Sequence, residues 1–234
     1  MPTAGKGGRY HHGDLRTALI DTAIEIIGER GVRGFSMAEA TRRLGVAVSA
    51  PYAHFADRDA LLAAVAVHAY QLFSAELRPA GAEQTPVDRL ASMARGYVRF
   101  AAAHRPLFDL LYEAGLDKAR HPELEEAERP INEGFSACVL AISGADEAAA
   151  DDLATAVEAT AHGLVTLLLD GEYDADAVDR TADRAARATL ALVESRHLLS
   201  PPPVRPHGGQ PTARPGHVPE AGAGGGGGGQ RVAG

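Results

Sequence analysis

Residues 35–62 read FSMAEATRRLGVAVSAPYAHFADRDALL and contain the signals that define the N-terminal fold. Ser36 and Glu39 have the S-x-x-E spacing of a capping box, in which the two side chains bond free backbone amides at the start of a helix. Gly45 supplies the left-handed residue at which this helix ends and the chain turns. A second short helix is expected to follow, with Pro51 in its first turn, where proline is tolerated. The pattern predicts a helix-turn-helix.

Helix start and stop signals continue along the rest of the chain, while strand-type alternation is nearly absent. With the two helices of the motif, the second beginning near Val48, these signals predict an all-α fold of about nine helices. Pro130 is expected to kink or interrupt one of them. The other seven helices are expected at about residues 14–30, 57–77, 85–103, 106–112, 122–142, 146–169 and 176–198.

The run GVAVSAPYAHFADRDALL at residues 45–62 resembles the DNA-binding domain of TetR/AcrR-type transcriptional regulators, whose usual pattern is roughly GVSxxxLYxHFxxKxxLL. The upstream run YHHGDLRTALIDTAIEIIGERGVRGFSM resembles the first helix of the family and its link to the second. The matching residues in the first run are Gly45, Val46, Tyr52, His54, Phe55, Leu61 and Leu62.

The YHHGDLR opening and the proline before Tyr52 resemble the subgroup of this family whose C-terminal domain is called WHG. In that subgroup a tryptophan precedes a His-Gly pair by four residues. This chain has the pair at His162 and Gly163, but Glu158 stands at the position of the tryptophan.

The resemblance implies a three-helix helix-turn-helix domain, called the reading head below, and a C-terminal helical domain that binds a ligand and dimerises. The two ends of the chain differ from both in composition. The Pro/Gly-rich C-terminal segment has too little apolar area to offset the entropy cost of ordering. The expected divisions are a flexible basic arm at 1–13, the reading head at 14–56, the effector-binding and dimerisation domain at 57–199, and a disordered tail at 200–234.

Charge is distributed unevenly along the chain. The net charge of the 234 residues is −8, but residues 1–60 carry eight Lys or Arg against seven Asp or Glu. The acidic excess therefore lies outside the reading head. DNA binding is expected to depend on a few placed cations, with a modest dependence on salt.

Three features predict a cytoplasmic protein. The first ten residues lack the apolar stretch of a secretory signal. The apolar runs fall short of the roughly 20 residues that span a bilayer, so no membrane partner is expected. The single cysteine, Cys138, excludes an intramolecular disulfide and fits a reducing compartment.

By the resemblance, the second short helix faces the base edges of double-stranded DNA, and residues around it contact phosphates. Among the base-facing residues only Ser49 can hydrogen-bond, so shape should contribute more to specificity than direct readout. The alternative for Arg42 and Arg43 is a solvated helix face without a DNA contact. The candidate DNA-binding residues are Arg9, Ser36, Arg42, Arg43, Val48, Ser49, Ala50, Tyr52, Ala53, His54 and Arg58.

The family places a small-molecule pocket in the region that corresponds here to about residues 85–169. Such a cavity needs apolar and aromatic side chains with a few polar groups. The alternative is that the aromatic residues belong to the core and that His162 is a buried histidine bonded to a backbone carbonyl. The candidate ligand-binding residues are Met93, Tyr97, Phe100, Phe108, Leu111, Tyr112, Phe135, Cys138 and His162.

The last two expected helices are predicted to pair with their symmetry mates in a homodimer. Two reading heads held roughly 35 Å apart, or farther, would recognise a palindromic operator. An unidentified small-molecule effector lodged under the helix at 57–77 would change their spacing, which predicts a ligand-released repressor. The apolar residues expected at the dimer surface are Leu153, Val157, Val165, Leu168, Leu190, Leu192 and Val193.

Two other classes of function are weighed against a regulator. An enzyme is disfavoured because the HExxH, G-x-S-x-G and phosphate-loop motifs are missing from the sequence, so no catalytic residue, metal site or cofactor is expected. The other class is a helical dimer with a degenerate reading head that acts through protein partners. The near-neutral reading head favours it, and salt-sensitive, sequence-selective DNA binding would exclude both.

Overall fold

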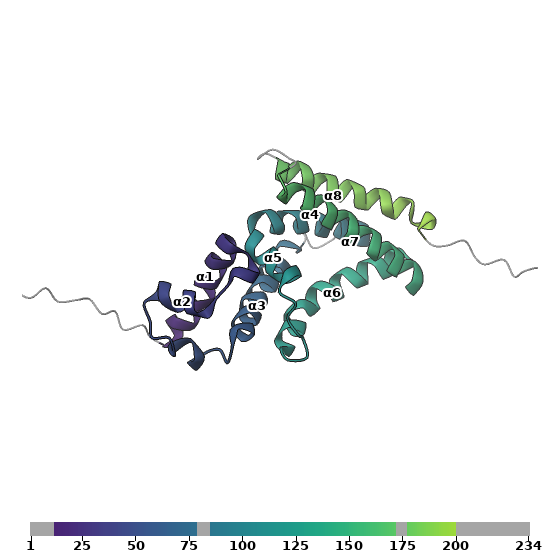
Figure 1. Ribbon diagram of the computed structural model, residues 1–234. Helices are drawn as coiled ribbons and strands as arrows, with labels where there is room; N and C mark the ends of the chain where they lie inside the picture. Colours follow the sequence, from purple (N-terminus) through teal and green to yellow (C-terminus); the bar gives the residue numbers. More distant parts are fainter. Residues whose placement is uncertain (1–11, 79–84, 172–176, 200–234) are drawn as a thin grey trace, which may run out of the picture. The chain divides into compact units, whose positions relative to one another are not determined.

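The computed structural model describes residues 12–78, 85–171 and 177–199, so the expected tail and most of the expected arm, including Arg9, lie outside the described residues. Every regular element in the described part is a helix (Figure 1), which confirms the all-α prediction. The elements are α1 (His12–Arg30), η1 (Val32–Gly34), α2 (Met37–Leu44), η2 (Ala50–Ala53), α3 (Arg58–Glu76), α4 (Pro86–Ala103), α5 (Arg105–Glu113), α6 (Pro122–Ile142), α7 (Glu147–Leu169), α8 (Ala177–Glu194) and η3 (Arg196–Leu198), where η denotes a 3-10 helix.

Three long helices begin where the sequence predicts, at polar side chains that bond the first turn. The Asp57 carboxylate accepts a hydrogen bond from the Ala60 amide at 2.8 Å, at the start of α3. Thr85 caps α4 in the same way, ahead of a proline at the first helical position. Asp146 accepts from two amides at the start of α7. Each cap satisfies amides that have no partner within the helix.

The capping box predicted at Ser36 and Glu39 is wrong. Ser36 is the N-cap of α2 and has an extended backbone, but its side chain makes no capping hydrogen bond. Glu39 instead accepts hydrogen bonds from Arg42 and Arg43. Two guanidinium groups offer the carboxylate charged donors where the start of the helix offers a neutral amide, so Glu39 bonds the arginines instead.

The second helix of the motif, predicted to begin near Val48, is shorter than expected. Only Ala50–Ala53 is helical, and as a 3-10 turn. Pro51 has no amide to donate back to Ala47, and the Tyr52 amide bonds Ser49 three residues before it. A 3-10 turn needs fewer consecutive donors than an α-helix, so it accommodates the proline.

Helix α6 runs without a break from Pro122 to Ile142, so Pro130 does not interrupt it, and a kink at Pro130, the other predicted outcome, stays a prediction. A proline inside a helix removes one backbone donor and frees one carbonyl. Pro130 is exposed. Water can therefore bond the freed carbonyl, which lowers the cost of keeping the helix continuous.

Helix α3 joins the reading head to the helices that follow. It contacts α1 on one side and α4, α5 and α6 on the other, while α8 packs mainly along α4. One apolar cluster runs through all of them, from Leu19 in the reading head through Leu62 and Phe100 to Val193. Because the core is shared, a displacement of α3 would also shift the reading head and the helices that follow α3.

Helix α7 leaves much of its surface uncovered. It is long and apolar enough to cross a membrane by length and composition alone, a test that core helices of soluble proteins also pass. Only 22% of an apolar 18-residue stretch of this helix is buried within the chain. The remaining surface is available to a partner.

Candidate DNA-binding surface and effector cavity

The reading head exposes the segment that follows its glycine turn. Gly45 has φ 66° and ψ 26°, the left-handed conformation predicted for it. Pro51 and Phe55 are buried and anchor the segment to the core. Val48, which lies between the turn and Pro51, is 73% exposed, and Tyr52, which lies between Pro51 and Phe55, is 57% exposed. Large exposed apolar side chains on an anchored turn are available to contact another molecule.

The predicted DNA-binding residues differ in how far they reach solvent. The exposed ones are Ser36, Arg42, Val48, Ser49, Tyr52 and Ala53. The half-buried ones are Arg43, Ala50, His54 and Arg58. Ten of the eleven are therefore exposed or half-buried, and the eleventh, Arg9, lies outside the described residues.

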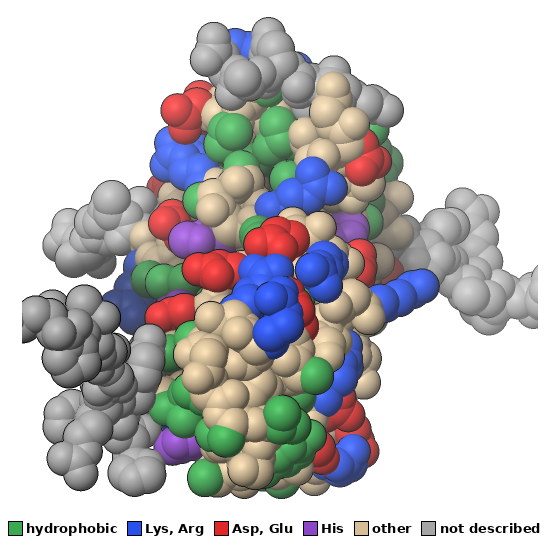
Figure 2. All heavy atoms as spheres, turned by 60° about the vertical axis from the view of Figure 1, so that its left-hand side comes forward, with side chains coloured by type: hydrophobic (Ala, Val, Ile, Leu, Met, Phe, Trp, Pro, Cys, Tyr) green, Lys and Arg blue, Asp and Glu red, His purple; other side chains and the backbone are tan. Residues whose placement is uncertain are grey.

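Acidic side chains pair with the arginines of the reading head. The Arg42 guanidinium donates to both carboxylate oxygens of Glu39, at 2.9 and 2.8 Å. Arg43 donates to Glu39 at 3.1 Å and to Glu29 at 2.8 Å. These bonds, that of Arg42 first, lower the pKa of Glu39 to about 2, so the carboxylate is ionised at neutral pH. Basic and acidic groups alternate on this side of the molecule, as Figure 2 shows at its centre.

Arg58 is bound inward instead of projecting freely. Its guanidinium donates to the backbone oxygen of Val32 at 2.9 Å and to that of Phe35 at 3.4 Å. It also lies 5.8 Å from the centre of the Phe35 ring, within cation–π range. This arginine thus joins the first turn of α3 to the 3-10 turn after α1.

A cavity of about 220 Å³ lies among five helices of the C-terminal part. Its wall is mostly apolar and aromatic, with a few carboxylates, hydroxyls and one amide. The lining residues are Tyr70, Phe73 and Leu77 from the end of α3, Met93, Ala94 and Tyr97 from α4, Leu111 and Tyr112 from α5, Glu128, Ile131, Asn132 and Phe135 from α6, and Val157, Glu158 and Ala161 from α7.

Nine residues are predicted to bind ligand, and they fall into two groups. Those in the cavity wall are Met93, Tyr97, Leu111, Tyr112 and Phe135. Those outside it are Phe100, Phe108, Cys138 and His162. Phe100 is fully buried and stacks on Phe73 with ring centres 4.7 Å apart. Cys138 is also buried, and burial raises the pKa of its thiol.

A chain of hydrogen bonds runs behind the cavity wall. The Tyr97 hydroxyl lies 2.7 Å from the Tyr112 hydroxyl and 2.8 Å from Nδ1 of His162. Burial, followed by the proximity of Tyr112, raises the pKa of Tyr97, so its hydroxyl stays protonated. His162 therefore supports the wall through Tyr97, and its predicted alternative partner, a backbone carbonyl, is replaced by a tyrosine.

The sequence prediction missed four polar groups of the wall, Tyr70, Glu128, Asn132 and Glu158. The Tyr70 hydroxyl donates to the Glu128 carboxylate at 3.3 Å, and Lys118 pairs with the same carboxylate. Tyr70 and Phe73 share a helical face with i, i+3 spacing, which is a signal that could have identified them. The two glutamates carry no such signal, because exposed glutamates are common on helices.

The predicted dimer surface is partly wrong. Leu153, Val157, Val165 and Val193 are buried inside the chain itself, where α7 and α8 pack on the core. Apolar residues of an amphipathic helix pack inward first, so the strongest apolar positions are used within the monomer. Of the remaining three, Leu190 is exposed and Leu168 and Leu192 are half-buried.

Two family models match the chain. The one described as bacterial regulatory proteins of the tetR family matches residues 19–65, and the one described as the tetracyclin repressor-like C-terminal domain matches residues 90–192. No curated protein sequence matches significantly. Within the described residues, no group of three or more His, Cys, Asp or Glu side chains is placed to hold a metal ion.

Several solved structures share the fold. A protein of unknown function from Rhodococcus sp. RHA1 is 32% identical, with a TM-score of 0.61 over 79% of this chain and 97% of that one. A TetR-like transcriptional regulator from the same organism is 18% identical, with a TM-score of 0.59 over 78% and 99% of the two chains. RolR in complex with its ligand resorcinol is 23% identical, with a TM-score of 0.52 over 82% and 95%.

The chain belongs to the TetR family of bacterial regulatory proteins, which confirms the family resemblance found in its sequence. It is a DNA-binding transcriptional regulator with a helix-turn-helix at its N-terminus. The narrower resemblance to the WHG subgroup stays a prediction, and so do the domain boundaries.

Proposed function

We propose that this regulator is a cytoplasmic, non-enzymatic repressor that binds a palindromic operator as a homodimer and leaves it when a small molecule fills the cavity. The observation that carries the proposal is the course of α3. Arg58 bonds its first turn to the reading head, and Tyr70 and Phe73 near its end line the cavity. A ligand that displaces α3 therefore also displaces the reading head, and by linkage such a ligand weakens DNA binding.

Contact with DNA would use the exposed turn and the nearby arginines. Val48 and Tyr52 extend from a turn held by buried neighbours, as a base-reading surface requires. Arg42 would exchange Glu39 for a phosphate. This exchange costs the existing ion pair, so affinity should be moderate and dependent on salt.

The dimer would form on the uncovered side of α7. Thr155, Ala159, Gly163 and Thr166 are all exposed and recur at helical spacing along one face. Small side chains allow two helices to approach closely, and exposed Leu190 on α8 adds apolar area. A two-fold axis through this face would pair the two copies of α7.

Small-molecule binding is consistent with the size and lining of the cavity. RolR, which shares the fold, binds resorcinol, a single-ring phenol. A cavity of about 220 Å³ suits a ligand of that order of size.

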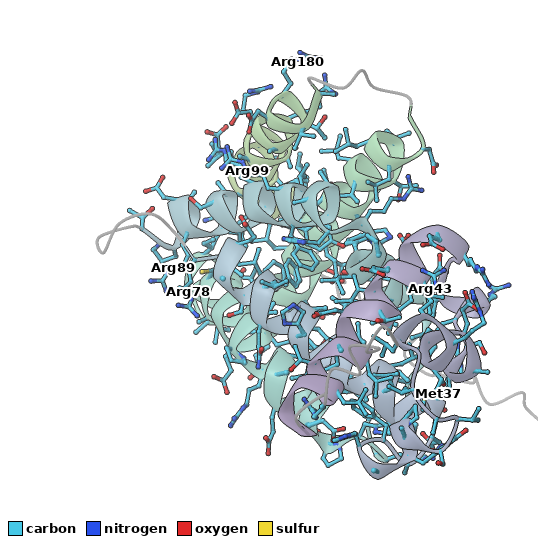
Figure 3. All side chains as sticks on the ribbon, turned by 90° about the vertical axis from the view of Figure 1, so that its left-hand side faces the viewer. Met37, Arg43, Arg78, Arg89, Arg99 and Arg180 are labelled. Atoms are coloured by element: carbon cyan, nitrogen blue, oxygen red, sulfur yellow. The ribbon has the colours of Figure 1, made fainter. Side chains whose placement is uncertain are left out.

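The operator is tested by fluorescence anisotropy with DNA flanking the chain's own gene, against excess random DNA and over a range of salt. Selective binding of two chains per site supports the proposal. Arg42→Ala should weaken binding and reduce the salt slope by about one. Arg99→Ala is the matched control, because Arg99 pairs with Asp179 and lies far from Arg43 in Figure 3.

The shortness of η2 and the paired arginines favour a second candidate, a dimer whose reading head no longer binds DNA and which acts through protein partners. Failure to bind any DNA at low salt would favour that candidate.

Dimerisation is measured separately by light scattering. Ala159→Arg on the exposed face of α7 should halve the molar mass, whereas Ala119→Arg, at an exposed position outside the helices, should leave it unchanged.

A further inference from the structure

The charge of the cavity wall is one-sided. Among its lining residues there are two glutamates and no lysine, arginine or histidine. Glu128 is balanced, because Lys118 pairs with it and the Tyr70 hydroxyl donates to it. Glu158 forms no ion pair or hydrogen bond with any described residue. It is also exposed, which places its carboxylate at the mouth of the cavity.

Aromatic rings surround the space beside Glu158. The wall includes five of them, from Tyr70, Phe73, Tyr97, Tyr112 and Phe135. Burial chiefly, then the proximity of Tyr112 and last the charge of Glu158 raise the pKa of Tyr97, which is consistent with a place for this carboxylate near the Tyr97 hydroxyl. The faces of such rings attract cations, and the attraction strengthens as water is excluded.

We infer that the cavity binds a small organic cation, a protonated amine or quaternary ammonium on an aromatic or apolar body, with its charge at Glu158. The body of the ligand would lie against the rings, and its charge would replace the missing partner of the carboxylate. This inference rests on the proposed function of the cavity as the effector site. At about 220 Å³ the space lies below the roughly 300 Å³ at which drug-sized pockets begin, so one or two rings fit.

A neighbouring hollow makes the opposite charge the main competing ligand class. It has about 140 Å³, shares Leu77, Met93 and Ile131 with the first cavity, and is lined by Arg78 and Arg89. Figure 3 shows these two arginines close together at the ends of α3 and α4. Both are exposed to water, where a cation is well solvated without a ligand. Glu158 is exposed as well, but five aromatic rings line its cavity whereas none lines the neighbouring hollow, so the charge placed beside rings is negative.

Calorimetric titration of the full chain distinguishes these classes with three single-ring probes of similar size. They are 2-phenylethylamine, a cation at neutral pH, the neutral 2-phenylethanol, and the anion 3-phenylpropanoate. The amine should bind roughly tenfold more tightly than the alcohol, a difference of about 1.4 kcal/mol. In Glu158→Gln that ratio should fall towards one while the affinity for the alcohol stays the same. Glu147→Gln, an exposed glutamate on the same helix outside the cavity, should retain the ratio.

Three results would overturn the inference: equal ratios in the wild type and Glu158→Gln, no binding of any probe, or tightest binding of the anion. In the last case Arg89→Gln would abolish the preference. DNA binding is measured on the same preparations. If the protein still binds its operator when any of these results is found, the inference of a cationic ligand is wrong and the DNA-binding function stands. If the protein binds the amine but no operator, the inference stands and the proposed DNA-binding function is wrong.

Discussion

The guanidinium of Arg58 donates a hydrogen bond to the backbone oxygen of Val32 across 2.9 Å, which links α3 to the turn after α1. The same helix ends at the cavity, where Phe73 and Leu77 line the wall. One helix thus connects the cavity with the reading head, and Arg58 adds polar bonds to the apolar packing of its N-terminal part on α1.

Arg58→Met should weaken this attachment while keeping the length of the side chain. Two carbonyl oxygens lose their donor, so the free energy of unfolding should fall by about 1 kcal/mol. Urea denaturation at constant protein concentration measures it. Arg33→Met, at an exposed position in η1, next to the Val32 that accepts the Arg58 bond, should change stability little. Equal stability of the two variants would show that the Arg58 bonds contribute nothing.

Gly96→Ala should destabilise the chain. A Cβ at this position would lie 2.5 Å from the backbone oxygen of Glu76, so α3 and α4 would have to move apart. Overpacking of this kind costs about 1–3 kcal/mol. Gly134→Ala is the control, because nothing lies within 4 Å of its Cβ and it should stabilise α6 by about 0.5–1 kcal/mol. Helix propensity alone predicts that both variants are more stable than the wild type. A lower free energy of unfolding in Gly96→Ala and a higher one in Gly134→Ala would therefore establish the close approach of α3 and α4.

Glu39→Gln should weaken the dependence of the free energy of unfolding on pH under acidic conditions. The folded pKa of Glu39 is about 2, below its ordinary 4.5, so its contribution is complete above pH 4.5 and is lost as the pH falls towards 2. The variant cannot lose a charge it does not have. Unfolding followed by circular dichroism between these pH values should therefore show a shallower slope than in the wild type, whereas Glu25→Gln should retain the full slope. The variant should also bind DNA more tightly, because it frees Arg42, while Arg43 keeps its bond to Glu29.

Tyr97→Phe should lower stability by about 1 kcal/mol, because it removes the hydroxyl that lies within hydrogen-bond distance of both Tyr112 and His162. Tyr52→Phe removes a hydroxyl from an exposed side chain and should stay within about 0.5 kcal/mol of the wild type. Urea midpoints of the two variants provide the comparison. A loss of similar size in both would mean that the chain of hydrogen bonds behind the cavity does not stabilise the fold.

Local signals predicted the helices well. Asp57, Thr85 and Asp146 begin helices at the expected positions, because a cap bonds amides only two or three residues away. Gly45 ends α2 for an equally local reason, its tolerance of a positive φ. Ser36 and Glu39 fail as a capping box because the carboxylate has arginine partners, including Arg43, which a four-residue motif does not include.

The candidate site was predicted less completely. Tyr97 and Tyr112 are recognisable in the sequence as aromatic residues on the right helices, and both line the cavity. Tyr70, Glu128 and Glu158 were not predicted to line it, since their place depends on how α3, α6 and α7 pack against one another.

The sequence by itself therefore determined the all-α class, the starts of α3, α4 and α7, the glycine turn and the family, because caps, turns and motif spacing act over a few neighbouring residues. Only the tertiary structure decided that Arg43 is paired with Glu29, that Arg58 bonds inward, and that Glu158 has no ion-pair or hydrogen-bond partner among the described residues at the cavity. These relationships join residues from different helices. Their geometry is set by the packing of the shared core, which no short stretch of sequence contains.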